Sequence, residues 1–296
     1  MNPLYLILLI FSLSACASVR PTTISDLPTQ QWKPGIYDLK SGEKISEDEL
    51  WRALKSAKYV LVGESHDSEK DHRVQLRAVE ALMSAESLVG FEMFQRPFQN
   101  VLDAYSAGKI SEEKMLAQSE WETRWGFELA FYSPIWKTAK AKKGNIVALN
   151  LRKELTKRIS AKGIDGLLDL ERADLPEVDL SNLTYKHWLE KIFSSHGAKM
   201  SEEKMQHFFE AQVLWDETMA DSAVEAVNKR KADRLIAIVG RGHFEWDWGI
   251  PSRIRRRIQS GYSDGKVRVL IPSEGNLPKI DVLKEKRFAD YIWVHE

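Results

Sequence analysis

The chain of 296 residues contains a single cysteine, Cys16, and no excess of charge of either sign. One cysteine excludes an intrachain disulfide and a zinc site made of several thiolates. Lys and Arg total 43, as do Asp and Glu, so no global positive field favours nucleic acid and we expect no nucleic-acid partner. Neither Gly-x-Gly-x-x-Gly nor a Walker loop occurs, so the sequence carries no nucleotide-binding fingerprint.

The first 15 residues have the pattern of a lipoprotein signal peptide. The apolar run from Leu4 to Leu13 is too short to span a bilayer as a mature helix. Leu13-Ser14-Ala15-Cys16 resembles a bacterial lipobox, in which the thiol of the cysteine is lipidated. The residues before Leu4 depart from the pattern, since they lack Lys and Arg, and an ordinary signal peptide with a chance cysteine is the alternative. Ala17, by resemblance to known lipoprotein sorting, favours the outer membrane, so we expect a lipid-anchored, periplasm-facing protein.

The rest of the chain predicts a tether followed by one folded domain. Residues 16–45, which include several prolines, serines and threonines, are assigned to the lipidated N-terminus and tether. Residues 46–296 alternate apolar strands with amphipathic helices, which predicts an α/β fold: a mostly parallel central sheet flanked by helices. Two helical insertions, about 97–143 and 185–230, are expected to form a smaller subdomain. Residues 291–294 are predicted to be a last edge strand.

Two similar motifs follow apolar strands near opposite ends of the domain. The first is Gly63-Glu64-Ser65-His66, and the second is Gly240-Arg241-Gly242-His243. Glu92 and Asn150 follow two further predicted strands. Because ligands of parallel sheets collect beyond the carboxyl ends of the strands, we expect these polar side chains to share one site.

The chemistry of such a site has several open readings. His66, Glu92 and His243 could hold a divalent metal ion with open positions, which would lower the pKa of a bound water. Without a metal, a histidine beside a glutamate, as in Glu64 and His66, could act as a general base. The plainer alternative is that each histidine caps its strand end and bonds to backbone. Two copies of the motif with Glu92 between them favour the joint site.

Other polar residues could support the two histidines. Gln212 and Asp216 lie four apart on one face of a predicted helix, where they either orient a histidine or cap a buried helix. Asn150 and Arg241, at strand ends, are candidates for the same supporting role. His72 and Gln75 are either solvated on an exposed helix face or part of the site.

A tyrosinate can hold ferric haem iron, and Tyr132 lies near Trp121 and Trp125, whose rings could sandwich a porphyrin. A buried tyrosine with a bonded hydroxyl is the alternative. The arginines from Arg253 to Arg257 either meet the propionates of such a ligand or form a solvated face.

As an ordered set, these motifs resemble the ChaN family of haem-binding lipoproteins, in the superfamily that includes Tiki proteases and erythromycin esterases. The resemblance spans about residues 55–260 and rests on Gly63–His66, Phe91-Glu92-Met93, Tyr132-Ser133-Pro134-Ile135, Gln212 with Asp216 and Met219-Ala220, and Gly240–His243.

The resemblance implies an outer-membrane lipoprotein that binds haem or an iron complex and takes part in iron acquisition. It also implies a homodimer that encloses the porphyrins. It implies a tyrosine as haem ligand, for which Tyr132 is our first choice and Tyr185 the reserve. By likeness to Tiki-type members, His66, His243 and Glu92 would serve metal-dependent cleavage. By likeness to the esterases, Glu64 and His66 would activate water. A hydrolase of amide or ester bonds is therefore the competing function, and a binding module with a vestigial site is the third.

Overall fold

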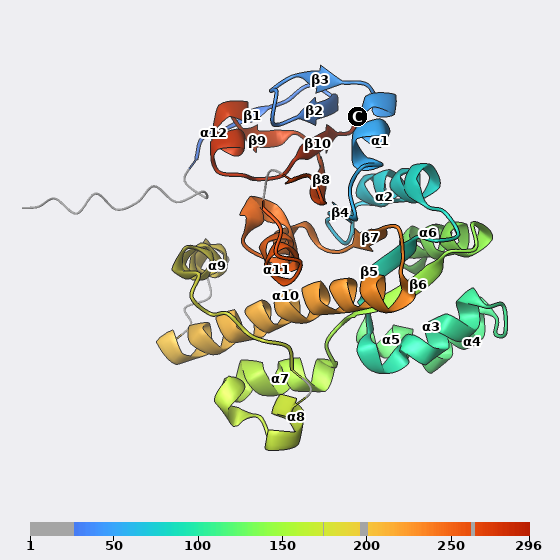
Figure 1. Ribbon diagram of the computed structural model, residues 1–296. Coiled ribbons are helices and arrows are strands. Elements are labelled where there is room, and N and C mark those ends of the chain that lie inside the picture. Colours follow the sequence, from blue (N-terminus) through green and yellow to red (C-terminus); the bar gives the residue numbers. More distant parts are fainter. Residues whose placement is uncertain (1–26, 174, 196–200, 262–263) are drawn as a thin grey trace, which may run out of the picture.

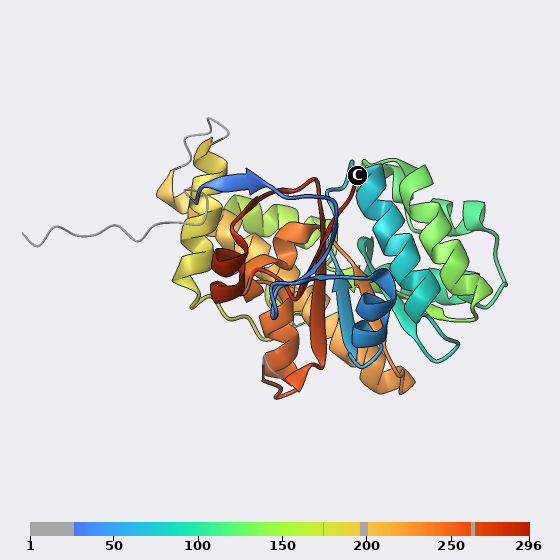
Figure 2. The ribbon, with the colours of Figure 1, turned by 90° about the horizontal axis from the view of Figure 1, so that it is seen from above.

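The structure, a computed structural model, describes residues 27–173, 175–195, 201–261 and 264–296. The predicted signal peptide, Cys16 and the first part of the predicted tether lie outside the described residues. The predicted fold class is confirmed, because an eight-stranded, mostly parallel sheet is flanked by helices (Figures 1 and 2). None of the helices in these described ranges is long and apolar enough to cross a membrane.

The sheet has the strand order β3-β2-β10-β8-β4-β7-β5-β6. In that order the strands are Lys44–Ile45, Gly35–Asp38, Tyr291–Val294, Val267–Ser273, Tyr59–Val62, Leu235–Ile238, Leu88–Gln95 and Asn145–Asn150. All pairs from β10 to β6 are parallel, and the two pairs involving β2 are antiparallel. The late strand β7 therefore lies between the early strands β4 and β5, which brings both Gly-x-x-His motifs to the same edge.

Part of the predicted tether belongs to the folded domain. β1 (Thr29–Gln31) pairs with β9 (Asn276–Pro278) in a separate two-stranded sheet, while β2 and β3 extend the main sheet. The folded region thus begins before the predicted boundary at residue 46. The predicted edge position of β10 is wrong, because β2 pairs with its outer side. β1, β2 and β3 are short and contain few apolar residues, so their sequences show too little alternation of apolar and polar residues to predict strands.

One face of the sheet is covered by the N-terminal helices and the first insertion (Figure 2). These elements are α1 (Glu47–Leu54), α2 (Glu69–Leu82), η2 (Arg96–Phe98), α3 (Gln99–Ser106), α4 (Glu112–Gln118), α5 (Trp121–Arg124) and α6 (Leu129–Ala141). A capping box begins α1: the Ser46 hydroxyl accepts from the Glu49 amide, and the Glu49 carboxylate accepts from the Ser46 amide.

The other face is covered by the second insertion and the C-terminal helices, with α10 running across the fold (Figure 1). The helices after β6 in the described residues are α7 (Lys153–Lys162), η3 (Ile164–Gly166), α8 (Asp169–Ala173), α9 (Leu183–Ser195), α10 (Glu202–Arg230), η4 (Arg241–His243), η5 (Glu245–Asp247), α11 (Ile250–Arg257) and α12 (Ile280–Glu285). Alternate residues of β4 enter the two cores, Val60 on one side and Leu61 on the other. Burial on both faces explains the continuous apolar run of this strand.

Candidate functional site

The two Gly-x-x-His loops contact each other directly beyond the ends of β4 and β7. The amide of Arg241 donates to the carbonyl oxygen of Glu64 at 2.8 Å. A Cβ on Gly63 would lie 3.2 Å from Cα of Arg241 and 2.8 Å from Cδ1 of Ile271. A side chain at position 63 would therefore press on the facing loop, and the close approach of the loops favours glycine there.

Glu64 is almost fully buried and its carboxylate is held by three side chains. Oε1 lies 2.6 Å from Nδ1 of His66 and accepts a 2.8 Å hydrogen bond from the hydroxyl of Tyr132. Oε2 accepts a 2.7 Å hydrogen bond from Nε2 of Gln75. Glu64 is thus a fixed anion that orients the imidazole of His66.

His72 and Gln75, which the sequence left open between exposed face and site, are buried beside Glu64. Nδ1 of His72 lies 2.9 Å from Oε1 of Gln75, and its Nε2 lies 3.2 Å from the carbonyl oxygen of His66. Positions 72, 75, 79 and 82 follow helical spacing and share the buried side of α2. This spacing was the available signal that both side chains face inward.

The second histidine is held in a similar way from α10. Nδ1 of His243 lies 2.6 Å from Oδ1 of Asp216, a side chain with no exposed surface, and 3.1 Å from Nε2 of Gln212. Its Nε2 lies 3.7 Å from Oε1 of Glu92. Gln212 and Asp216 therefore contact the histidine that they were predicted to orient, through the nitrogen opposite Glu92.

Glu92 lies between the two halves of the site. Its Oε2 accepts a 2.7 Å hydrogen bond from the amide of Gly240, and Asn150 donates to its backbone carbonyl at 3.0 Å. A Cβ on Gly240 would lie 3.1 Å from Nε2 of His66 and 3.4 Å from Oε2 of Glu92. His66 and Glu92 thus face the same small space above Gly240, so the predicted residues from three strand ends do converge.

The donor geometry does not support the predicted divalent metal on His66, Glu92 and His243. Among the described residues, no group of three or more His, Cys, Asp or Glu side chains has the arrangement of a metal site. Nδ1 of each of the two histidines is paired with a carboxylate, which leaves Nε2 as the nitrogen available to the site. The guanidinium of Arg241, which was predicted to support the histidines, pairs with Glu245.

The first arginine of the basic run on α11 does not lie on a solvent-exposed face. Arg253 is buried, with Nε 3.1 Å from Oε1 of Glu217 and Nη1 4.0 Å from Oδ2 of Asp216. Arg256 and Arg257 also pair with the buried carboxylate of Glu217. These arginines therefore compensate buried acids behind His243, because an unpaired buried carboxylate would be costly.

Both predicted haem ligands are buried tyrosines. Burial, together with the charge of Glu64, raises the pKa of Tyr132, and burial raises the pKa of Tyr185 well above its ordinary value. The assignment of either as an iron ligand stays a prediction. It requires Tyr132 to release Glu64 and lose its proton, because a tyrosine ligand is a phenolate.

Charge pairs dominate the titration of the site. Burial acts to lower the pKa of His243, but the charge and hydrogen bond of Asp216 outweigh it, so this pKa is raised. The pKa of His66 is also raised, because the hydrogen bond to Glu64 and the charges of Glu92 and Glu64 outweigh burial. Burial acts to raise the pKa of Glu64, but its contacts with His66, His72 and Gln75 leave it lowered.

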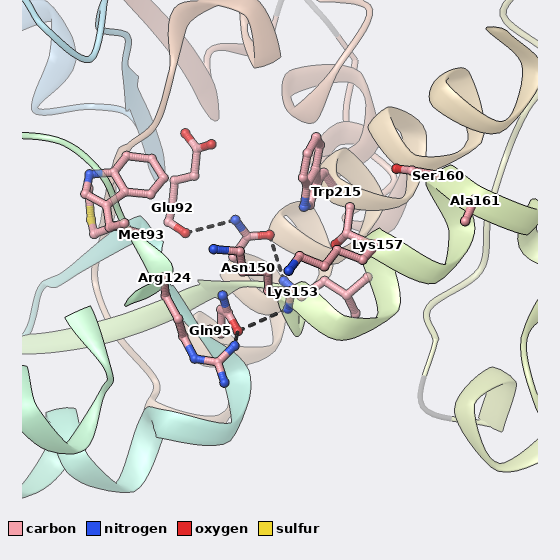
Figure 3. Close-up of a pocket in the computed structure, with 13 residues that line it drawn as sticks. Glu92, Met93, Gln95, Arg124, Asn150, Lys153, Lys157, Ser160, Ala161 and Trp215 are labelled. Atoms are coloured by element: carbon pink, nitrogen blue, oxygen red, sulfur yellow. Dashed lines mark hydrogen bonds between the residues drawn. The ribbon is translucent and has the colours of Figure 1, made fainter. Parts of the chain in front are cut away.

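A cavity of about 520 Å³ opens beside Glu92, between β5, α5, α7 and α10 (Figure 3). Its lining includes Trp125 from the end of α5, Trp215 from α10, and Lys153 and Lys157 from α7. This volume lies within the range of roughly 300–1,000 Å³ typical of small-molecule sites. Of Trp121 and Trp125, which the sequence suggested as rings flanking a porphyrin, Trp125 lines this cavity and Trp121 does not. The contribution of α7 was missed because that helix was not predicted.

Residues 50–254 match the model of the family described as haem-binding uptake, Tiki superfamily, ChaN. The chain belongs to this family of haem-binding uptake proteins. No functionally curated protein matches the sequence.

Among solved structures, the chain is similar to ChaN of Campylobacter jejuni, described with cofacial haem binding, at 23% identity and a TM-score of 0.67. That similarity covers 90% of this chain and 98% of the other. The type III effector HopBA1 matches at 12% identity and a TM-score of 0.46, over 91% and 97% of the two chains. The erythromycin esterase EreC matches at 11% identity and a TM-score of 0.43, over 82% of this chain and 77% of the other.

Asp216→Asn tests the electrostatic account of His243. A histidine with a raised pKa stabilises the fold below its unfolded pKa, about 6.5, and that contribution is lost as pH rises through the folded pKa. We therefore expect the free energy of unfolding to fall less steeply between pH 6 and 8.5 in the variant than in wild type. At pH 6 the variant should also lose about 1–3 kcal/mol. Urea unfolding at both pH values measures this.

Glu225→Gln, at an exposed position of the same helix, is the matched control. Its free energy of unfolding should change with pH as steeply as that of wild type. If Asp216→Asn and Glu225→Gln have the same slope as wild type, Asp216 does not set the titration of His243.

Proposed function

We propose that the protein is a periplasm-facing lipoprotein of the outer membrane that binds haem and takes part in iron acquisition. Membership of the haem-binding uptake family supports haem as the cargo. The anchoring part of the proposal is supported by the lipobox at Leu13–Cys16 alone.

The cavity beside Glu92 is the observation that carries the haem proposal. Haem is flat and largely apolar, with two carboxylates at one edge. Trp125 and Trp215 supply aromatic surface for the ring, and Lys153 and Lys157 supply cations at the rim. The chemistry of the lining therefore fits the ligand. To bind iron, Tyr132 has to give up its hydrogen bond to Glu64.

A haem titration of the chain from residue 17 onward, which retains every described residue, tests the cargo. We expect a shift of the Soret band that saturates at a fixed stoichiometry, because a specific site holds the iron in one environment. A titration without any Soret shift would reject the haem proposal. Sedimentation with and without haem measures whether binding coincides with the proposed homodimer.

Tyr132→Phe tests the ligand separately. For a tyrosine ligand we expect the spectrum of the complex to change, because the phenolate oxygen is lost while the ring remains. A spectrum that survives the substitution unchanged would reject Tyr132 as the ligand and leave the haem proposal standing.

Cys16→Ser tests the anchor in a Gram-negative host. We expect the wild-type chain to incorporate labelled palmitate and to sediment with outer membranes. The variant should do neither, because Cys16 is the only cysteine in the sequence and so the only thiol that could carry the lipid. Unchanged membrane association of an unlabelled variant would require another mode of attachment.

A hydrolase is the second candidate, favoured by the two acid-histidine pairs on either side of Glu92. An imidazole oriented through Nδ1 by a carboxylate can use Nε2 as a general base on water. A short aryl ester and an aminoacyl anilide are suitable probes. We expect His66→Gln to reduce hydrolysis by about 10²-fold or more. If wild type and His66→Gln hydrolyse both probes at the same rate, this function is rejected.

A further inference from the structure

One face of α7 lines the cavity beside Glu92. Lys153, Thr156, Lys157, Ser160 and Ala161 follow the helical spacing i, i+3, i+4, i+7 and i+8, and all five line it. Figure 3 shows Lys153 and Lys157 on this helix, across the cavity from Glu92. The helix therefore gives the cavity a polar, basic wall.

The charges of the lining are distributed unevenly. Arg124 is compensated by Glu120 and Glu154, with N–O distances of 2.7 and 3.0 Å. Lys153 donates to the backbone carbonyl of Thr123 at 2.9 Å, a neutral acceptor, and no carboxylate among the described residues pairs with its ammonium group. Lys157 is exposed at the rim. The positive charge of the cavity is thus concentrated on these two lysines.

The opposite end of the cavity is acidic and fixed. Glu92 lines the cavity and is held by Gly240 and Asn150 through its side chain and backbone. An anionic group of a ligand is disfavoured beside this carboxylate and favoured beside the lysines. The cavity therefore has a defined electrostatic direction, from acid at the inner end to base at α7.

We propose that Lys153 and Lys157 form a carboxylate-binding subsite that orients the ligand, so that the cavity takes porphyrins with free carboxylates and discriminates against their esters. The inference rests on the proposed function, because it assumes that the porphyrin occupies this cavity. A lysine ammonium offers three donors, so Lys153 keeps two for a carboxylate after its bond to Thr123. Charge-assisted hydrogen bonds of this kind are the stronger ones in proteins.

Iron-free protoporphyrin IX and its dimethyl ester separate the subsite from iron coordination. Quenching of tryptophan fluorescence measures their affinity, since Trp125 and Trp215 line the cavity. We expect wild type to bind the diacid about tenfold more tightly than the diester at low salt. The preference should shrink at high salt, because partly exposed charges are screened.

The variant Lys153→Ala/Lys157→Ala should lose about tenfold in affinity for the diacid and leave the diester unchanged. Alanine favours helix, so α7 is expected to persist. Lys162→Ala, at an exposed position of the same helix outside the cavity lining, is the matched control and should behave as wild type.

Equal wild-type affinity for diacid and diester, or equal losses for both porphyrins in the double variant, would overturn the subsite. If haem still shifts its Soret band in that case, the proposed function stands without the subsite. If wild type binds neither haem nor protoporphyrin IX, the proposed function fails and the subsite with it.

Discussion

The hydrogen bond of 2.7 Å from the amide of Gly240 to the carboxylate of Glu92 joins the two halves of the site. It depends on the strand order, because β7 lies between β4 and β5 and all three strands run parallel. Residues that are far apart in the sequence therefore meet at one edge of the sheet. The 2.8 Å contact between the Arg241 amide and the Glu64 carbonyl fixes the same junction from the other side.

Buried negative charge is the second constraint. Glu64, Glu92, Asp216 and Glu217 are all buried near the junction, and each needs a donor or a cation to avoid a large desolvation cost. His66 and His243 lie within ion-pair distance of the first three carboxylates, and the arginines of α11 form ion pairs with Glu217. The same pairing raises the pKa of His66 and His243 and holds their rings in one orientation. Within the described part of the chain, no carboxylate pairs with Lys153 or Lys157, which distinguishes the cavity rim from its inner end.

Apolar periodicity and strand-end chemistry predicted much of this arrangement. The continuous apolar run of β4 and the alternation of strands with helices were sufficient for the fold class, because a parallel sheet buries both faces. The contacts of Glu64 with Tyr132 and Gln75 depend on how α2 and α6 pack, which no local pattern encodes. The short strands were missed because β2 pairs non-locally with β10, and β3, which pairs with β2, has only two residues. The helix α7, which forms the basic wall, was not predicted because its sequence is largely polar.

The central claim is that the cavity between Trp125 and Trp215 holds the porphyrin beside Glu92. A crystal structure of the protein with bound haem tests it most directly. The account predicts a porphyrin between the two tryptophans with its carboxylates directed to Lys153 and Lys157. An ordered porphyrin bound at another surface, with this cavity left to solvent, would contradict it.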